Sequence, residues 1–213
     1  MTVAAEPVRF ASGELTLVGV LHRPQGSGLP AVAVCHPHPL YGGDMENNVV
    51  LALCNALTGG GMMALRFNFR GVGGSGGSHG GGVGEREDAR AALDFLAGLA
   101  EVDSGRLGLA GYSFGALVAL TAGDERVRAV AAVSPPAGGL DAGRVQPDIP
   151  TLLISGDRDD ISPSVRLPEL AAALGSRCET RPVAGADHFW WGHEDALATA
   201  VFGFLRVQLV DGV

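Results

Sequence analysis

The chain has 213 residues, of which 46% are hydrophobic, and a formal net charge of −8 at pH 7. This length suits one domain with a full hydrophobic core, so we expect a single domain over residues 1–213. The chain contains 15 Lys and Arg residues in total. Because phosphate binding needs clustered positive charge, we expect no nucleic-acid partner.

The sequence predicts neither a secretion signal nor a membrane partner. The first ten residues hold no positive segment followed by a long apolar run. No run of 18 apolar residues occurs further along the chain, so we expect no spanning helix. These features favour a cytoplasmic protein, and they predict nothing about its oligomeric state.

The apolar pattern predicts an α/β fold. Residues 8–24 contain two alternating runs around Ser12 and Gly13, which is typical of an antiparallel hairpin. Short continuous apolar runs follow, as in parallel strands buried on both faces, at 31–35, 62–69, 106–110, 127–133 and 151–155. Helices are expected at about 47–58, 85–98, 114–122, 165–174 and 193–209. This alternation predicts a doubly wound, mostly parallel sheet with helices on both faces, which binds ligands at the carboxyl ends of its strands.

The loop after the first buried strand begins His36-Pro37-His38-Pro39. In this architecture that loop supplies one backbone donor of an oxyanion hole. Proline has no amide hydrogen, so the donor is His38, Leu40 or Tyr41, and we favour His38. A metal site at His36 and His38 is not expected, because no further ligand cluster completes the set.

A glycine-rich stretch after the strand at 62–69 satisfies the pattern G-x-G-x-x-G between Gly71 and Gly76. Its glycines continue through Gly84 without opening a helix, and no strand-end acid follows about 20 residues on, as a dinucleotide site requires. We therefore expect no cofactor, and we interpret the stretch as a long flexible loop that borders the site.

Ser113 lies in a Gly-x-Ser-x-Gly motif, Gly111 to Gly115, directly between a predicted strand and an apolar helix. This context is typical of a nucleophile elbow, where larger side chains two residues either way would collide. The amide of Phe114 would then be the second oxyanion donor. The alternative interpretation is a glycine-flanked serine that caps a helix.

A serine nucleophile requires a base and an orienting acid, which follow in the chain order Ser, Asp, His. The loop after the strand at 151–155 contains three competing carboxylates: Asp157, Asp159 and Asp160. His188 lies on a loop after the next strand-like segment and is the predicted general base. The remaining histidines are interpreted as surface, glycine-loop and helix-start residues: His22, His79 and His193.

With these motifs the chain resembles the α/β-hydrolase superfamily over nearly its whole length. More closely it is similar to the small, lid-less bacterial hydrolases related to dienelactone hydrolase, on motifs that are here His36 to Gly43, Arg66 to Ser75, and Asp187 to Phe189. The resemblance implies Asp159 as the acid, since Gly156 and Pro163 frame it in the superfamily pattern Gly-x-x-Asp-x-x-x-Pro. Dienelactone hydrolase itself has a cysteine nucleophile, which weakens any transfer of its substrate to a chain with Ser113.

The resemblance also implies an open cleft, because residues 134–150 leave no room for the helical cap that many relatives insert there. We expect its walls to include Leu40, Tyr41, Phe114, Pro135, Phe189, Trp190 and Trp191. An apolar cleft favours small or slender acyl esters. The predicted function is therefore a serine carboxylesterase that needs no metal or cofactor. The alternatives are a thioesterase or acyltransferase with the same triad and, less expected, a non-catalytic binding module.

Overall fold

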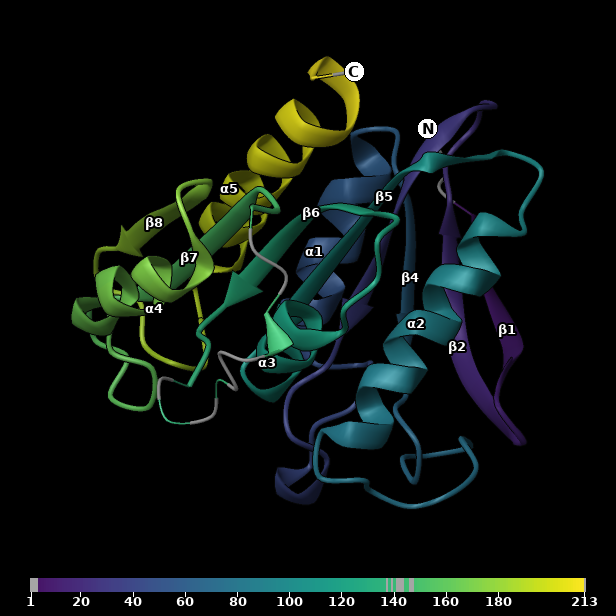
Figure 1. Cartoon of the computed structure of the whole chain (residues 1–213), viewed down its shortest axis with the longest axis horizontal. Helices are drawn as coiled ribbons and strands as arrows, with labels where there is room; N and C mark the ends of the chain where they lie inside the picture. The colour runs from purple at the N-terminus through teal and green to yellow at the C-terminus, as the bar shows by residue number, and fades with distance from the viewer. Residues whose placement is uncertain (1–3, 137, 139, 141–143, 146–147, 213) are drawn as a thin grey trace.

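The computed structural model describes residues 4–136, 138, 140, 144–145 and 148–212. Within this part of the chain the strands form one eight-stranded sheet in the order β1-β2-β4-β3-β5-β6-β7-β8. Figure 1 shows the sheet crossing the molecule with helices in front and behind. The strands are β1 (Ala4–Ser12), β2 (Leu15–Arg23), β3 (Leu29–Cys35), β4 (Met63–Phe67), β5 (Val102–Tyr112), β6 (Val127–Val133), β7 (Thr151–Gly156) and β8 (Cys178–Val183).

The sheet has the predicted mixture of directions. Strands β1 and β2 form the antiparallel hairpin, and β2 pairs antiparallel with β4. From β4 to β8 every neighbouring pair is parallel. The predicted fold class, a mostly parallel sheet with an antiparallel amino-terminal hairpin, is therefore confirmed.

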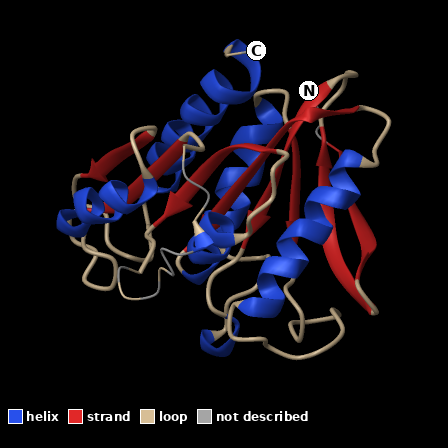
Figure 2. Ribbon diagram, in the orientation of Figure 1, coloured by secondary structure: helices blue, strands red, loops and turns tan. Residues whose placement is uncertain are grey.

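The helices cover both faces of the sheet, as Figure 2 shows. They are α1 (Asn48–Gly59), α2 (Val83–Ala97), α3 (Phe114–Thr121), α4 (Leu167–Leu174) and α5 (Glu194–Arg206). Residues of α2, α3 and α4 belong to one apolar cluster, and those of α1 and α5 to the other. Because successive side chains of a strand point to opposite faces, Ala33 of β3 packs in the first cluster and Val32 and Val34 in the second.

Two predicted helix boundaries differ from those of the structure. Helix α2 begins at Val83 and includes Gly84, so the glycine-rich stretch does open a helix, which was expected to begin at about residue 85. The last helix ends at Arg206 and continues as a π-helical turn over Val207–Asp211. Among the described residues no helix is both long and apolar enough to cross a membrane.

The strand register brings the predicted loops together at the carboxyl ends of the parallel strands. Cys35 at the end of β3 pairs with Gly111 of β5, so the proline-containing loop starts beside the serine turn. Tyr112 pairs with Val133, and Gly156 pairs with Val183. The loops after β3, β5, β6, β7 and β8 therefore leave the sheet at the same end.

Candidate active site

Ser113 lies on a sharp turn between β5 and α3 with φ 55° and ψ −118°. Such a positive φ is strained for a residue other than glycine, and the surrounding structure holds it in place. The amide of Ser113 donates to the carbonyl of Val133 at 2.9 Å. The turn needs both glycines, because a Cβ on Gly111 would lie 2.1 Å from the Gly115 oxygen, and one on Gly115 would lie 2.3 Å from the Cys35 oxygen.

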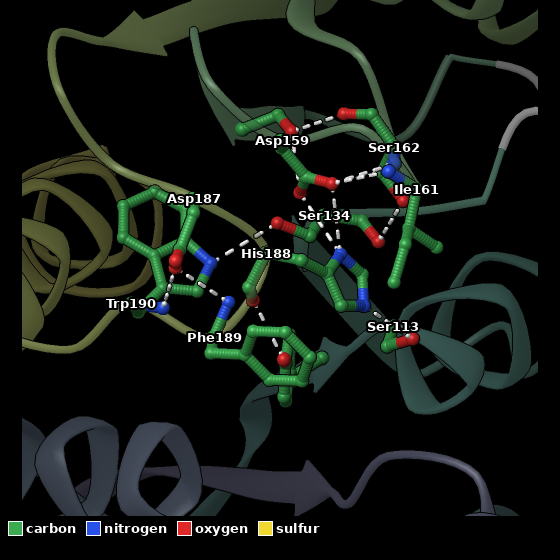
Figure 3. A network of polar contacts seen from close by, with 11 residues as sticks. Ser113, Ser134, Asp159, Ile161, Ser162, Asp187, His188, Phe189 and Trp190 are labelled. Carbon is green, nitrogen blue, oxygen red and sulfur yellow. Dashed lines mark hydrogen bonds and ion pairs between the residues drawn. The ribbon is translucent and has the colours of Figure 1, made fainter.

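The ring of His188 bridges Ser113 and Asp159 (Figure 3). Its Nε2 lies 3.1 Å from the Ser113 hydroxyl oxygen, and its Nδ1 lies 2.9 and 3.0 Å from the two Asp159 carboxylate oxygens. The hydroxyl of Tyr112 donates to the backbone carbonyl of His188 at 2.6 Å. Because an Nδ1–H donates to the carboxylate, Nε2 is left as an acceptor facing the serine hydroxyl.

The Asp159 carboxylate is buried and heavily hydrogen-bonded. Its Oδ1 accepts from the backbone amides of Ser162 at 2.7 Å and Ile161 at 3.0 Å, and Ser155 donates to its Oδ2 at 3.2 Å. Burial alone would raise the pKa of Asp159, but hydrogen bonds from His188, Ser162 and Ser134 outweigh it and lower the pKa. The carboxylate therefore stays ionised and holds His188 in one orientation.

The other acids of this region have different positions. Asp157 is exposed and accepts from the amide of Gly185 at 2.8 Å, and Asp160 is also exposed. Asp187 accepts from the amides of Phe189 at 2.9 Å and Trp190 at 3.1 Å, so it stabilises the turn after His188. Among the acids considered from the sequence, the structure thus brings Asp159 to the histidine ring.

The loop after β3 uses most of its amides internally. Leu40 N–H donates to His38 Nδ1 at 3.2 Å, and Tyr41 N–H donates to the His38 carbonyl at 3.1 Å. Within the described part of the chain, the amides of His38 and Phe114 have no backbone or side-chain acceptor. Of the three candidate donors in this loop, His38 is therefore the one whose amide is available.

A cleft of about 710 Å³ opens above Ser113 and His188. It is lined by Pro37, His38, Tyr41, Gly42, Gly43, Asn47, Tyr112, Ser113, Phe114, Leu117, Pro136, Ile161, His188 and Phe189. Three of the predicted wall residues line it: Tyr41, Phe114 and Phe189. Ile161 and Leu117 were missed, since neither a loop isoleucine after an acid nor one leucine of an apolar helix signals a cleft position.

Four predicted wall residues lie elsewhere, and the prediction was wrong for them. Trp190 is fully buried, and its Nε1 donates to the Ser134 hydroxyl at 3.0 Å. Pro135 is buried, and its neighbour Pro136 lines the cleft instead. Leu40 and Trp191 are each 71% exposed and are not among the residues that line the cleft.

The glycine-rich stretch borders the site, as its position predicted. Its amides at Gly80 and Gly82 both donate, at 2.7 Å, to the carboxylate of Glu85 in the first turn of α2. Because this buried carboxylate occupies the helix amino terminus, those amides are not left for a pyrophosphate. The rings of His79 and Phe114 lie 5.6 Å apart, so the stretch forms the outer support of the Phe114 side of the cleft.

The geometry around the loop after β3 supports neither a metal ion nor a reactive thiol at Cys35. Among the described residues, no three His, Cys, Asp or Glu side chains are grouped to hold a metal ion. Cys35 is buried, and burial raises the pKa of its thiol far above neutrality. An un-ionised, buried thiol is a poor nucleophile.

Comparisons with known proteins agree with this fold. The model of a family described as X-Pro dipeptidyl-peptidase (S15 family) matches residues 14–145. An uncharacterized protein of Rickettsia prowazekii is 33% identical over 209 residues, which cover 93% of this chain and 87% of that protein.

Two solved structures are similar over nearly their whole length. An alpha-beta serine hydrolase homologue from Coxiella burnetii is 35% identical, with a TM-score of 0.82 and coverage of 95% of this chain and 97% of that one. A serine hydrolase without a lid from Xanthomonas campestris is 32% identical, with a TM-score of 0.84 and coverage of 99% and 96%. The narrower relation to dienelactone hydrolase stays a prediction.

Proposed function

Because the chain belongs to the S15 family of α/β serine hydrolases, we propose that it hydrolyses carboxylic esters with small or slender acyl groups. The observation that carries this proposal is the continuous contact from Asp159 through His188 to Ser113, 2.9 and 3.1 Å long, at the base of the cleft. Nucleophile, base and orienting acid are then in hydrogen-bond reach of one another, as acyl transfer requires.

In this mechanism Ser113 Oγ attacks the ester carbonyl while His188 Nε2 takes the hydroxyl proton. The amides of His38 and Phe114 stabilise the oxyanion that develops. His188 then protonates the leaving alcohol, and an acyl-enzyme remains on Ser113. Water, deprotonated by His188, hydrolyses that acyl-enzyme in the second half of the reaction.

The chemistry of the cleft supports an uncharged acyl group. Its described lining contains aromatic and aliphatic side chains and no Asp, Glu, Lys or Arg. A dipeptidyl substrate would bring a free ammonium group, for which these residues offer no counter-charge. Apolar contact with Tyr41, Phe114 and Phe189 instead favours the acyl chain of an ester.

The same residues would serve a thioesterase or an acyltransferase. Rates on matched acyl esters and acyl thioesters, with and without an added alcohol, separate the three activities. We favour the ester because the lining offers no cationic side chain for the phosphates of a nucleotide-bearing thioester carrier. A cytoplasmic location stays a prediction.

The test is Ser113→Ala, measured with p-nitrophenyl esters of two to ten carbons and with a fluorescent fluorophosphonate. We expect loss of both hydrolysis and labelling. The variant should unfold at the same temperature as the wild type or slightly above it, because the strained turn keeps both glycines. A matched control is Ser78→Ala, an exposed serine of the glycine-rich stretch, with unchanged rates. Wild-type-like hydrolysis by Ser113→Ala would rule the mechanism out.

A further inference from the structure

His36 is a fully buried histidine directly after β3 that takes no part in the contacts between Ser113, His188 and Asp159. Its Nε2 accepts the backbone N–H of Phe69 at 3.1 Å. The proton of the neutral ring is therefore on Nδ1, which lies 2.6 Å from the Pro37 carbonyl oxygen and donates to it. Burial lowers the pKa of His36 to about 4, so the ring is neutral at neutral pH.

The Pro37 carbonyl and the His38 amide belong to the same peptide group. This peptide is trans, since the described chain contains no cis bond. In a planar trans peptide the C=O and N–H bonds point in opposite directions. With the Pro37 oxygen held inward by His36, the His38 N–H points outward, toward the cleft that Pro37 and His38 line.

Gly43 also lies close to the Pro37 carbonyl. A Cβ at position 43 would lie 2.3 Å from the Pro37 oxygen, and the Gly43 amide donates to the His38 carbonyl at 3.0 Å. The His36 side chain and the Gly43 backbone thus confine the peptide group between Pro37 and His38. A flip of this peptide plane would leave His36 Nδ1–H without an acceptor in the core.

We infer that His36 is a positioning residue for the oxyanion hole, which orients the His38 amide by holding the carbonyl of the same peptide group. The inference rests on the proposed function, because it concerns the donor that stabilises the oxyanion. A histidine suits this role because one rigid ring presents a donor and an acceptor, and so ties the loop after β3 to Phe69 after β4.

The experiment compares His36→Phe with His36→Asn in the full-length protein. Phenylalanine keeps a ring against Phe69, whose centroid lies 4.6 Å from that of His36, but it cannot donate to Pro37. Asparagine places an N–H donor near the Nδ1 position. The matched control is His22→Phe, another buried histidine, which accepts from Arg66 Nε at 3.1 Å and lies on β2 away from the cleft.

The measurements are kcat and KM on a p-nitrophenyl ester and the affinity for a trifluoromethyl ketone with the same acyl chain, which forms an oxyanion on the nucleophile. We expect His36→Phe to lower kcat by about 10²-fold with KM within about twofold, and to weaken the ketone by a similar factor. We expect His36→Asn to stay within about tenfold of the wild type on both measures.

Three results would overturn the inference: unchanged kcat in His36→Phe, equal losses in His22→Phe and His36→Phe, or ketone affinity that does not follow kcat. If His36→Phe does not fold, His36→Asn decides, since a 10²-fold loss there contradicts the role of the Pro37 hydrogen bond. Absence of ester hydrolysis in the wild type is a separate result, which rejects the proposed function before any variant is compared.

Discussion

The indole nitrogen of Trp190 lies 3.0 Å from the hydroxyl oxygen of Ser134, and both residues have positive φ angles, 63° and 46°. Ser134 follows β6 and helps to lower the pKa of Asp159. Its carbonyl accepts from the hydroxyl of Ser162, whose amide donates to the Asp159 carboxylate, both at 2.7 Å. Figure 3 shows Trp190 and Ser134 on the far side of His188 from Ser113. Trp190, expected in the cleft wall, therefore supports the acid from within the core.

Replacing Trp190 by Phe removes the N–H that fixes Ser134. We expect the free energy of unfolding to fall by about 2 kcal/mol, because a buried hydroxyl loses a partner and the smaller ring leaves a gap. We also expect kcat to fall several-fold with KM unchanged. The matched control, Trp191→Phe, changes a residue that is 71% exposed and should shift stability by less than about 0.5 kcal/mol. Equal effects at both positions would contradict the support role.

Asp159→Asn tests which carboxylate orients His188. An amide cannot fix the ring in the tautomer that leaves Nε2 free, so we expect kcat to fall about 10⁴-fold with little change in KM. Asp160→Asn, the exposed neighbour, should keep kcat within about twofold. The measurement is steady-state hydrolysis by variants that unfold cooperatively on heating. A large loss in Asp160→Asn instead would show that the acid has been wrongly assigned.

Phe189→Ala tests whether the apolar rim of the cleft binds the acyl chain. Phe189 lines the cleft and is 55% exposed, so a substrate chain can cover it. Losing about 1 kcal/mol of apolar contact should raise KM about fivefold for an octanoyl ester and leave an acetyl ester nearly unchanged. Trp191→Ala, adjacent but outside the cleft lining, should alter neither value. An equal rise for both esters would argue against acyl binding at this position.

The buried His36 should make stability depend on pH. Burial lowers its pKa from 6.5 to about 4 in the folded protein, against smaller opposing effects of the Pro37 carbonyl and the Asp44 and Glu85 carboxylates. Between these two values the unfolded chain binds a proton that the folded protein does not. The free energy of unfolding therefore decreases as pH falls from about 6.5 to about 4.

The measurement is urea unfolding of the wild type and His36→Phe at pH 7, 5.5 and 4. At about 1.4 kcal/mol per pKa unit, the wild type should lose about 3 kcal/mol more than the variant across this window. Groups other than His36 titrate in both proteins, so the difference isolates this ring. Parallel pH profiles would contradict the assignment of a buried, neutral His36.

The sequence by itself determined the elements and the nucleophile position. Continuous apolar runs separated by helical segments determine a mostly parallel sheet, because such strands must be buried on both faces. The elbow at Ser113 could also be predicted from its motif between a strand and a helix. A Cβ on Gly111 would clash with Gly115 of the same turn, whereas a Cβ on Gly115 would clash with Cys35 of the neighbouring strand β3. The apolar runs and the turn at Gly111 are local requirements of backbone and side-chain size, and a single stretch of sequence carries them.

Only the tertiary structure decided which of two adjacent residues faces solvent and which faces the core. Trp190 and Trp191 are adjacent residues of the same type. Trp190 is buried and contacts Ser134, 56 positions away, whereas Trp191 is exposed. The role of His36 likewise depends on Phe69, 33 positions away in the loop after β4. Such choices follow from long-range packing and hydrogen bonding, which no local pattern encodes.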